Sequence, residues 1–303
     1  MSPGRVVVTA PAKINLSLGV GPVRPDGFHP LATVYQAIGL YDEVTARRGD
    51  GWSLSVAGGG RIPVHDVPID ERNIAVRAAM LLAEHHGRDP DVEIVLHKGI
   101  PVAGGMAGGS ADAAATLLAC DTLWGTRTPK QELMELAAVL GSDVPFALVG
   151  GTAIGAGRGE VVTPAMTRGQ LWWVVLESDT GLSTPAVYGE FDLLHAGEAV
   201  ADPEIPDPLM AALRSGDVEL LGRLLSNDLQ AAAFRLRPEL ERALALGRAE
   251  SACGAIVSGS GPTCLFLCAS RAHAAEVAAG LDDHGLGVLS LAPGPVPGAR
   301  VVG

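Results

Sequence analysis

Long apolar runs are missing from this sequence, and so are the marks of an exported chain. No uninterrupted apolar stretch approaches the ~20 residues that a membrane-spanning helix requires. The first residues, MSPGRVVVTAPAK, lack the apolar core of a signal peptide. We therefore expect a cytoplasmic protein that does not enter a membrane.

Cysteine and positive charge are also scarce. Cysteines occur only at positions 120, 253, 264 and 268, with no CxxC spacing and no histidine pairing nearby. Reduced thiols on small buried side chains are therefore expected, rather than disulfides or a zinc site. Lysine and arginine total 22 against 34 acidic residues, which gives a net charge of −12. That balance argues against broad binding to nucleic acid or to an anionic membrane, but leaves room for a local basic site.

What the sequence does contain is enough apolar residues for large cores. It has 303 residues, of which 48% are hydrophobic and 18% charged. A chain of this length exceeds the size at which a single core usually stops growing, so two domains are expected. We find no internal repeat and no low-complexity tail.

The most informative segment is PVAGGMAGGSADAAATLL, Pro101 to Leu118, in which glycines run directly into an alanine-rich helix. We call its glycine-dense part, Gly104 to Gly109, the glycine loop. Glycines let successive backbone N–H groups point the same way, and the following helix offers unpaired N–H groups and the positive end of its dipole. This pattern predicts a cradle for the phosphates of a nucleoside triphosphate. It is not the common P-loop, because no lysine follows Gly109; an ordinary glycine-rich turn before a helix is the alternative.

Apolar alternation in the first sixty residues predicts a twisted, mostly antiparallel sheet. A helix is expected from Asn73, as its N-cap, to about His86, and another from Lys130 to Leu140, with a strand over Val92–Leu96 between them. The strands expected in the first sixty residues are Val6–Thr9, Ile14–Val20, Leu31–Leu40, Glu43–Arg47 and Trp52–Val56.

From Leu171 onward the pattern becomes β, α, β, β, α, β, with three or four helical stretches inserted between Thr184 and Gly247. This order suggests a ferredoxin-like second domain. Its expected strands are 171–177, 255–258, 263–268 and 288–291, with a final helix over 272–281.

Three ordered segments carry a family resemblance: PAKINLSL near the N-terminus, the glycine loop, and VSGSGPT at Val257 to Thr263. Together they resemble the signature segments of the GHMP kinase superfamily of small-molecule kinases. The segments DGFHPLATV, GSDVPF and GLSTPAVY further resemble the family of kinases that act on 4-(cytidine 5′-diphospho)-2-C-methyl-D-erythritol.

The resemblance implies an α+β, two-domain GHMP kinase fold. An N-terminal, ATP-binding domain like ribosomal protein S5 domain 2 would cover residues 1–164, and a ferredoxin-like C-terminal domain residues 165–303. It also implies ATP-dependent phosphorylation of the 2-hydroxyl of the methylerythritol moiety, a step of the non-mevalonate route to isoprenoid precursors, in a cleft between the domains. Magnesium is expected as the counter-ion of ATP; we identify no all-protein metal site, in keeping with how this ion usually binds.

By the resemblance, Asp143 in GSDVPF is the catalytic base and Lys13 in PAKIN is the cation beside it. An alcohol is a weak nucleophile, so phosphoryl transfer to it needs a positioned base and charge stabilisation. The lysine would hold the carboxylate ionised and stabilise the developing alkoxide. Taken alone, each residue could be ordinary: a turn aspartate at a helix end and a solvated lysine on an edge strand.

The resemblance also assigns the nucleotide to the glycine loop and its surroundings. Asn73 and Lys98 match positions that approach the adenine and ribose, though each could equally be a helix cap or a surface lysine. The sequence departs from the usual pattern at Ala103 and Ala107, which replace glycines, and at Ala111, which replaces a serine. Alanine can occupy right-handed helical or extended backbone, so the cradle is expected to survive, while an obligatory hydroxyl at 111 is in doubt. The expected nucleotide-binding residues are Asn73, Lys98, Pro101, Gly104, Gly105, Gly108, Gly109 and Ser110.

A cytosine ring needs flat surfaces to stack on and groups that read its edge. The resemblance places Phe28 and Tyr188 on either side of the base and His29 at its edge; the family commonly has tyrosine at the first position. A lone aromatic residue is more often core, but the chain has only 5 Phe and 3 Tyr, so two within these motifs are informative. The expected substrate-binding residues are Asn15, Phe28, His29, Thr184, Tyr188, Gly259, Ser260 and Gly261.

Two alternative functions are considered, of which only the second belongs to a different class. The chain could be another GHMP kinase, acting on homoserine, mevalonate or a sugar, but DGFH and STPAVY would then have no cytosine to bind. It could be a catalytically silent sensor of a nucleotide or metabolite, but a sensor has no need of Lys13 and Asp143. The expected partner is a small molecule with a cytidine diphosphate group; the sequence indicates no particular oligomeric state.

Overall fold

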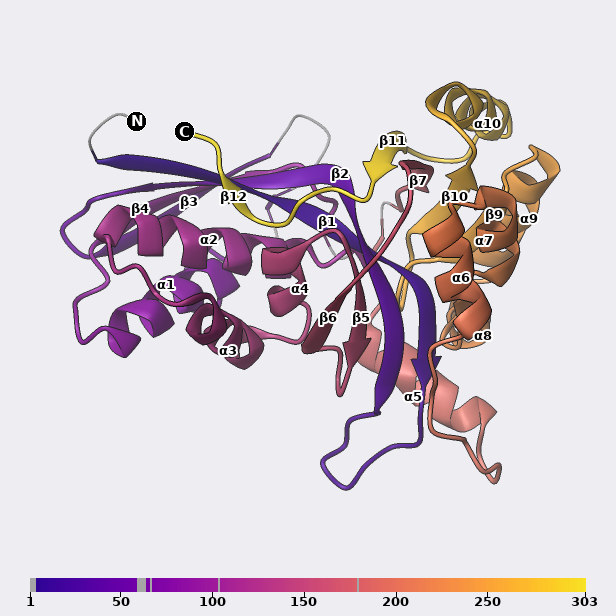
Figure 1. Ribbon diagram of the computed structural model, residues 1–303, viewed down its shortest axis with the longest axis horizontal. Coiled ribbons are helices and arrows are strands. Elements are labelled where there is room, and N and C mark those ends of the chain that lie inside the picture. The colour runs from indigo at the N-terminus through magenta and orange to yellow at the C-terminus, as the bar shows by residue number, and fades with distance from the viewer. Residues whose placement is uncertain (1–3, 59–63, 66, 103, 179) are drawn as a thin grey trace.

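The chain folds into two lobes, each built on its own β-sheet with helices packed against it (Figure 1). The structure is a computed structural model that describes residues 4–58, 64–65, 67–102, 104–178 and 180–303. None of the helices within these ranges has both the length and the apolar character needed to cross a membrane.

The first lobe is organised around a long hairpin of β1 (Arg5–Val20) and β2 (Leu31–Arg47). These strands pair antiparallel over their whole length, with irregularities after Pro11 and Asn15. Four separate strands were predicted here; the structure has two, because these irregularities let the strands bend without ending the ladder. The same sheet also contains β3 (Trp52–Gly58), β4 (Val92–Lys98), β5 (Thr152–Ala156), β6 (Val161–Ala165), β8 (Ser226–Asn227) and β12 (Arg300–Val301).

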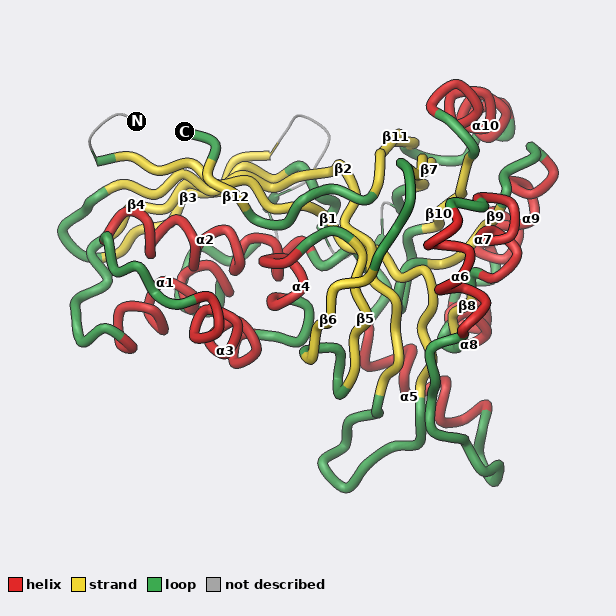
Figure 2. The backbone as a smooth tube through the Cα atoms, in the orientation of Figure 1, coloured by secondary structure: helices red, strands yellow, loops and turns green. Residues whose placement is uncertain are grey.

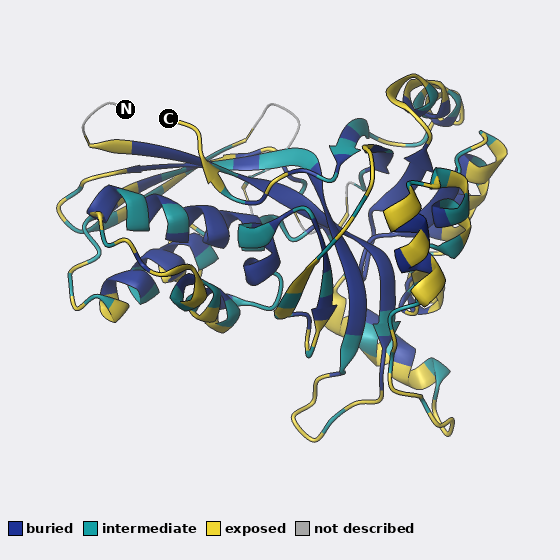
Figure 3. Ribbon diagram, viewed as in Figure 1, coloured by how far each residue is buried: buried dark blue, intermediate teal, exposed yellow. Residues whose placement is uncertain are grey.

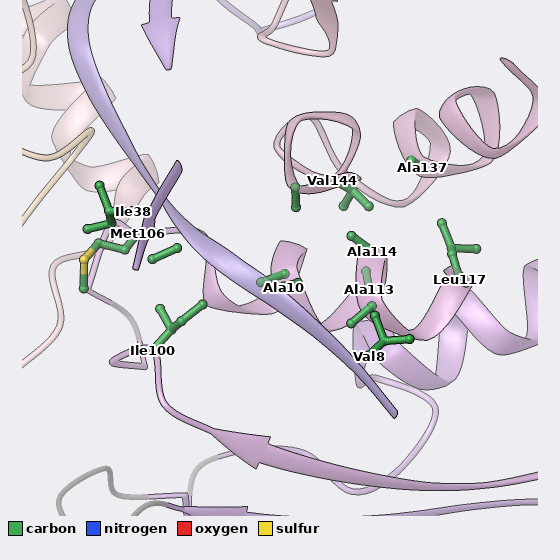
Figure 4. Close-up of a cluster of buried hydrophobic side chains, with 14 of the residues drawn as sticks. Val8, Ala10, Ile38, Ile100, Met106, Ala113, Ala114, Leu117, Ala137 and Val144 are labelled. Carbon is green, nitrogen blue, oxygen red and sulfur yellow. The ribbon is translucent and has the colours of Figure 1, made fainter. Parts of the chain in front are cut away.

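Helices cover one face of this sheet, with α2 in the centre (Figure 1). Small side chains let α2 approach the sheet closely: Ala113 and Ala114 lie near Val8 and Ala10 of β1 in one buried cluster (Figure 4). The three helices predicted in this lobe are confirmed, and Asn73 caps the first by accepting from the Ala75 N–H at 2.9 Å. The helices are α1 (Ile74–His85), α2 (Gly108–Trp124), α3 (Lys130–Leu140) and the unpredicted α4 (Val144–Val149).

The second lobe has a four-stranded antiparallel sheet in the order β11-β7-β10-β9. Its strands are β7 (Leu171–Leu176), β9 (Gly254–Val257), β10 (Cys264–Cys268) and β11 (Leu289–Gly294), with α10 (Arg271–Asp283) between the last two. This is the predicted ferredoxin-like order. The helices inserted between β7 and β9 are α5 (Thr184–Leu194), α6 (Asp207–Ser215), α7 (Val218–Leu224), α8 (Gln230–Leu236) and α9 (Glu239–Ala249).

Strands, rather than a flexible linker, join the two lobes. The far part of the β1–β2 hairpin extends toward the second lobe (Figure 2), where Leu18 and Val20 enter the core. Two short strands from later in the chain also pair with β1. β8 pairs with Ser17 and Leu18, and β12 pairs with Val8 and Thr9. The predicted domain boundary between residues 164 and 165 falls within β6 and stays a prediction.

Burial follows the same plan. The paired parts of β1 and β2 are mostly buried, whereas the turn that connects them, residues 21–30, is largely exposed (Figure 3). This turn carries the DGFH motif to the edge of the space between the lobes.

Candidate active site

A cavity of about 930 Å³ lies where the two lobes meet. It is lined by β1, the start of α2, the residues before α4, the first turns of α5 and the loop that follows β9. The residues predicted for catalysis, nucleotide and substrate all line it except Ser110 and Gly261. Ser110 lies in the first turn of α2, and Gly261 has a positive φ of 79° in the loop after β9.

Lys13 and Asp143 meet inside this cavity. The Lys13 ammonium lies 3.3 Å from Asp143 Oδ2, and the two side chains are 9% and 30% exposed. Lys13 Nζ also donates to Asn15 Oδ1 at 3.1 Å and lies 5.0 Å from the centre of the Tyr35 ring. Two motifs far apart in the sequence are thus brought together as an ion pair whose carboxylate is the more accessible partner.

Hydrogen bonds behind the pair fix its orientation. Alternation along β1 puts Lys13 and Asn15 on one face of the strand. Asn15 donates from Nδ2 to Thr33 Oγ1 at 2.7 Å, and Thr33 donates in turn to the Ser17 carbonyl at 2.7 Å. Asn15 Oδ1 is therefore left facing the lysine.

Tyr35 is a cavity residue that the sequence reading missed. Its side chain is buried, and burial together with the negative charge of Asp143 raises the pKa of Tyr35 well above its usual value. The phenol therefore stays neutral. Its position two residues after Thr33 on the same face of β2 is the signal that could have indicated it.

The glycine loop turns sharply into α2, and here one expectation is wrong. Ala107 was expected in right-handed helical or extended backbone, but it has φ 57° and ψ 36°, in the left-handed region. The turn into the helix requires this conformation, which glycine adopts freely and alanine only at a cost. Ala103 lies outside the described residues, and Ala111 is buried in the core beneath α2.

The loop is also close to the second lobe. A Cβ on Gly105 would lie 2.6 Å from the Ser258 carbonyl oxygen and 2.8 Å from that of Gly261. Ser258 Oγ donates to the Gly105 carbonyl at 3.2 Å. Glycine at 105 is thus required both by its φ of 74° and by this close approach.

The cradle has the properties that a triphosphate needs. Gly108 and Gly109 line the cavity and open α2, whose first N–H groups have no partner within the helix. Within the described ranges no group of three or more His, Cys, Asp and Glu side chains is placed to hold a metal ion.

Lys98 lies at the cavity wall, but its ammonium is held by two carboxylates. It donates to Asp42 and, at 2.7 Å, to Asp112. Burial and the neighbouring Asp42 raise the pKa of Asp112 to about 8, although Lys98 opposes that rise. Burial alone would lower the pKa of Lys98, but the two carboxylates outweigh it and raise the pKa. Neither aspartate was predicted. For Asp112, the signal that could have indicated it is a single carboxylate in the otherwise small and apolar start of α2, since a buried carboxylate needs a partner.

Aromatic rings gather around His29, which also lines the cavity. Its ring centre lies 5.2 Å from that of Tyr188 and 5.9 Å from that of Phe191, and its Nδ1 donates to the Gly21 carbonyl at 2.7 Å. Phe28 is 51% exposed, with the guanidinium of Arg158, another unpredicted cavity residue, 5.0 Å from its ring centre. Burial raises the pKa of Tyr188 to about 12.

A hydroxyl pair joins this end of the cavity to the second lobe. Thr184 Oγ1 and Ser260 Oγ are 2.9 Å apart, which links the first residue of α5 to the loop after β9. Gly259 in that loop lies close to Asn15, because a Cβ there would be 3.4 Å from Asn15 Oδ1.

Known proteins resemble the chain over almost its whole length. Residues 73–151 match the GHMP kinases N terminal domain, and residues 209–286 match the GHMP kinases C terminal domain. The chain is 56% identical to the 4-diphosphocytidyl-2-C-methyl-D-erythritol kinase of Nocardioides sp. over 97% of this chain and 98% of that protein. It is 53% identical to the protein of the same name from Thermobifida fusca, over 99% of each. The chain belongs to this kinase family.

Solved structures agree with this family assignment. A crystal structure of 4-(cytidine 5′-diphospho)-2C-methyl-D-erythritol kinase matches with a TM-score of 0.76 and 32% identity, over 96% of this chain and 99% of that one. Homoserine kinase from Cytophaga hutchinsonii, at 20% identity and a TM-score of 0.74, shares the fold. The predicted two-domain GHMP kinase fold is thereby confirmed.

Proposed function

We propose that this protein is an ATP-dependent kinase that phosphorylates the 2-hydroxyl of 4-(cytidine 5′-diphospho)-2-C-methyl-D-erythritol. One observation carries the proposal: the Lys13–Asp143 pair lies in a cavity that the glycine loop and the His29 and Tyr188 rings also line. Family membership with relatives above 50% identity supports the same conclusion.

In this proposal Asp143 accepts the proton of the substrate hydroxyl while the hydroxyl oxygen attacks the γ-phosphorus of ATP. The bond to the β-phosphate oxygen breaks, so the products are the phosphate monoester and ADP. Lys13, at 3.3 Å, stabilises the anionic carboxylate and the negative charge that develops on the attacking oxygen. Because Asn15 orients the ammonium, the pair is preorganised for this task.

The nucleotide is assigned to the loop side of the cavity. Gly104, Gly105, Gly108 and Gly109 give the phosphates access to backbone N–H groups, and the start of α2 adds its positive dipole end. Pro101 and Asn73 line the same side, Ser110 follows in the first turn of α2, and magnesium would arrive with ATP.

The cytidine is assigned to the aromatic side. Phe28 and Tyr188 would stack on the base and His29 would read its edge, with its Nδ1 already committed to Gly21 and its Nε2 left for the ligand or for Asp192, 3.6 Å away. Asn15, Thr184, Gly259 and Ser260 also line the cavity and are assigned to polar groups of the substrate, and Gly261 shapes the loop that carries Gly259 and Ser260. We also propose that the protein acts in the cytoplasm. Its two domains are proposed to cover residues 1–164 and 165–303.

The experiment is an assay of the purified protein with magnesium and ATP against a panel of alcohols. The panel contains the cytidine-linked methylerythritol, homoserine, mevalonate and galactose, and phosphorus NMR identifies each product. A new monoester signal at the 2-position of the methylerythritol unit, with ADP in equal amount, is expected. Phosphorylation of homoserine, mevalonate or galactose in preference would overturn the proposal, and nucleotide binding without any product would favour the sensor.

A further inference from the structure

Lys98, Asp42 and Asp112 form a buried ion triad beneath the glycine loop. Their side chains are 3%, 0% and 6% exposed. The three residues come from different elements: Lys98 ends β4, Asp42 lies on β2 and Asp112 lies in α2. The triad therefore ties the start of α2 to two strands of the sheet.

Asp42 also fixes the backbone that leads into the loop. Its Oδ1 accepts the N–H groups of Gly99 and Ile100 at 2.7 and 2.8 Å, while its Oδ2 accepts from Lys98. Asp112 lies one helical turn after Gly108, on the segment that leaves the loop. One carboxylate thus anchors the entry to the glycine loop and the other its exit.

The triad lies directly behind the expected phosphate position. A Cβ on Gly108 would be 3.4 Å from Lys98 Nζ and 3.5 Å from Asp42 Oδ2. The triad therefore packs directly against Gly108, and Lys98 and Asp112 also line the cavity.

Charge makes the lysine indispensable in this arrangement. One ammonium serves two carboxylates, and Asp112 Oδ1 has no hydrogen-bond partner among the described residues. Without the ammonium, the Asp42 carboxylate would be buried with no cation beside it and would repel a triphosphate bound above it, and Asp112 would lose its donor. With it, they serve as anchors.

We propose that Lys98 is a positioning residue for the nucleotide, which acts through Asp42 and Asp112 on both ends of the glycine loop and makes no contact of its own with ATP. The inference rests on the proposed function only in locating the ATP phosphates at the glycine loop. It replaces the expectation that Lys98 approaches the adenine and ribose.

The test separates an indirect from a direct role of Lys98 by also neutralising Asp42 and Asp112, the two side chains to which it donates. Lys98→Met keeps the length of the side chain without its charge. The triple variant Lys98→Met, Asp42→Asn, Asp112→Asn is neutral throughout, and the amide oxygen introduced at position 42 can still accept from the Gly99 and Ile100 N–H groups. Lys130→Met, on the exposed start of α3, is the control for loss of one positive charge. The measurement is the affinity for the non-hydrolysable analogue AMP-PNP with magnesium by calorimetry, alongside thermal unfolding.

We expect Lys98→Met to bind AMP-PNP about 30-fold more weakly or worse, the triple variant to recover to within about fivefold of wild type, and Lys130→Met to match wild type. A triple variant as weak as Lys98→Met would mean that the ammonium contacts the nucleotide, and would overturn the proposal. Wild-type affinity in Lys98→Met would overturn it as well. If Lys98→Met does not fold, the triple variant is compared with wild type alone. An AMP-PNP affinity within about fivefold of wild type supports the proposal, and a loss of about 30-fold or more overturns it.

The acceptor alcohol takes no part in this measurement, so the two proposals fail separately. A wild-type protein that binds AMP-PNP but leaves the cytidine-linked methylerythritol unphosphorylated would count against the proposed substrate and not against the triad.

Discussion

Lys13 lies behind Asp143 as seen from the cavity: their charged groups are 3.3 Å apart, yet the lysine side chain is 9% exposed and the aspartate 30%. The carboxylate is thus the member of the pair that an alcohol can reach, while the ammonium is held by Asn15 and faces the Tyr35 ring. This order favours Asp143 as the proton acceptor and Lys13 as its electrostatic partner.

Replacing Asp143 with asparagine should lower turnover by about 10²–10⁴-fold, the usual contribution of a general base. The amide cannot accept the proton but has nearly the same shape, so the fold and AMP-PNP affinity should be largely kept. Steady-state kinetics of Asp143→Asn beside calorimetry would check both. Near-wild-type turnover in a folded variant would remove Asp143 from the role of base.

Removing the ring of Tyr188 should weaken binding of the cytidine substrate by about 1–3 kcal/mol, the value typical of base–aromatic stacking. The KM for ATP should barely change, because the ring is assigned to the cytidine and the glycine loop to the nucleotide phosphates. Kinetics of Tyr188→Ala and Phe28→Ala with each substrate varied in turn provide the measurement. Some loss in turnover can accompany the loss in binding, since the base positions the hydroxyl.

Tyr188→Phe is the matched control for that experiment, because it keeps the ring that faces His29 at 5.2 Å and loses only the hydroxyl. It should bind the cytidine substrate nearly as wild type does. Equal losses for ATP and for the alcohol in the alanine variants, or no loss for either, would mean that these rings do not recognise the base.

Ala107→Gly should stabilise the protein. Left-handed backbone costs alanine about 1–2 kcal/mol, and the extra freedom of glycine in the unfolded chain costs about 0.4–1 kcal/mol, which leaves a net gain of about 1 kcal/mol. Urea unfolding would measure it. Ala113→Gly, in the right-handed interior of α2, is the control and should destabilise the protein; a loss of stability in both variants would contradict the assigned conformation of residue 107.

Asp112→Asn should change how stability depends on pH. The pKa of Asp112 is raised to about 8 in the folded protein, so the folded state holds a proton that the unfolded chain releases near pH 4. Wild-type stability from this group is therefore lost as pH rises from about 4 to about 8, whereas asparagine does not titrate. The free energy of unfolding should be measured for both proteins at about pH 5 and about pH 9. The value for the variant minus that for wild type should be larger at about pH 9. Parallel changes in the two proteins would contradict the raised pKa.

Local patterns predicted those parts of the site whose geometry is set within a few residues. Asn73 as an N-cap and the glycine loop before α2 both depend on neighbouring residues. The family resemblance then assigned Lys13 and Asp143 to one site, and the structure brings them together.

The features that were missed depend on distant segments or on backbone conformation. The Asp42–Lys98–Asp112 triad joins two strands and a helix, so no pattern of neighbouring residues predicts it. β8 and β12 are two-residue strands that exist only because β1 offers free edges to pair with. The left-handed backbone of Ala107 follows from the turn into α2, which overrides the preference of alanine.

The continuous β1–β2 hairpin limits how the enzyme can admit and release its ligands. A hinge rotation between the lobes would have to bend both paired strands together, which strains the ladder hydrogen bonds that join them. We therefore expect ligand exchange to depend on the hairpin's exposed tip, residues 21–30, moving while the lobes stay fixed. That tip carries Phe28 and His29, so the residues proposed to recognise the base would also govern the rate at which it leaves.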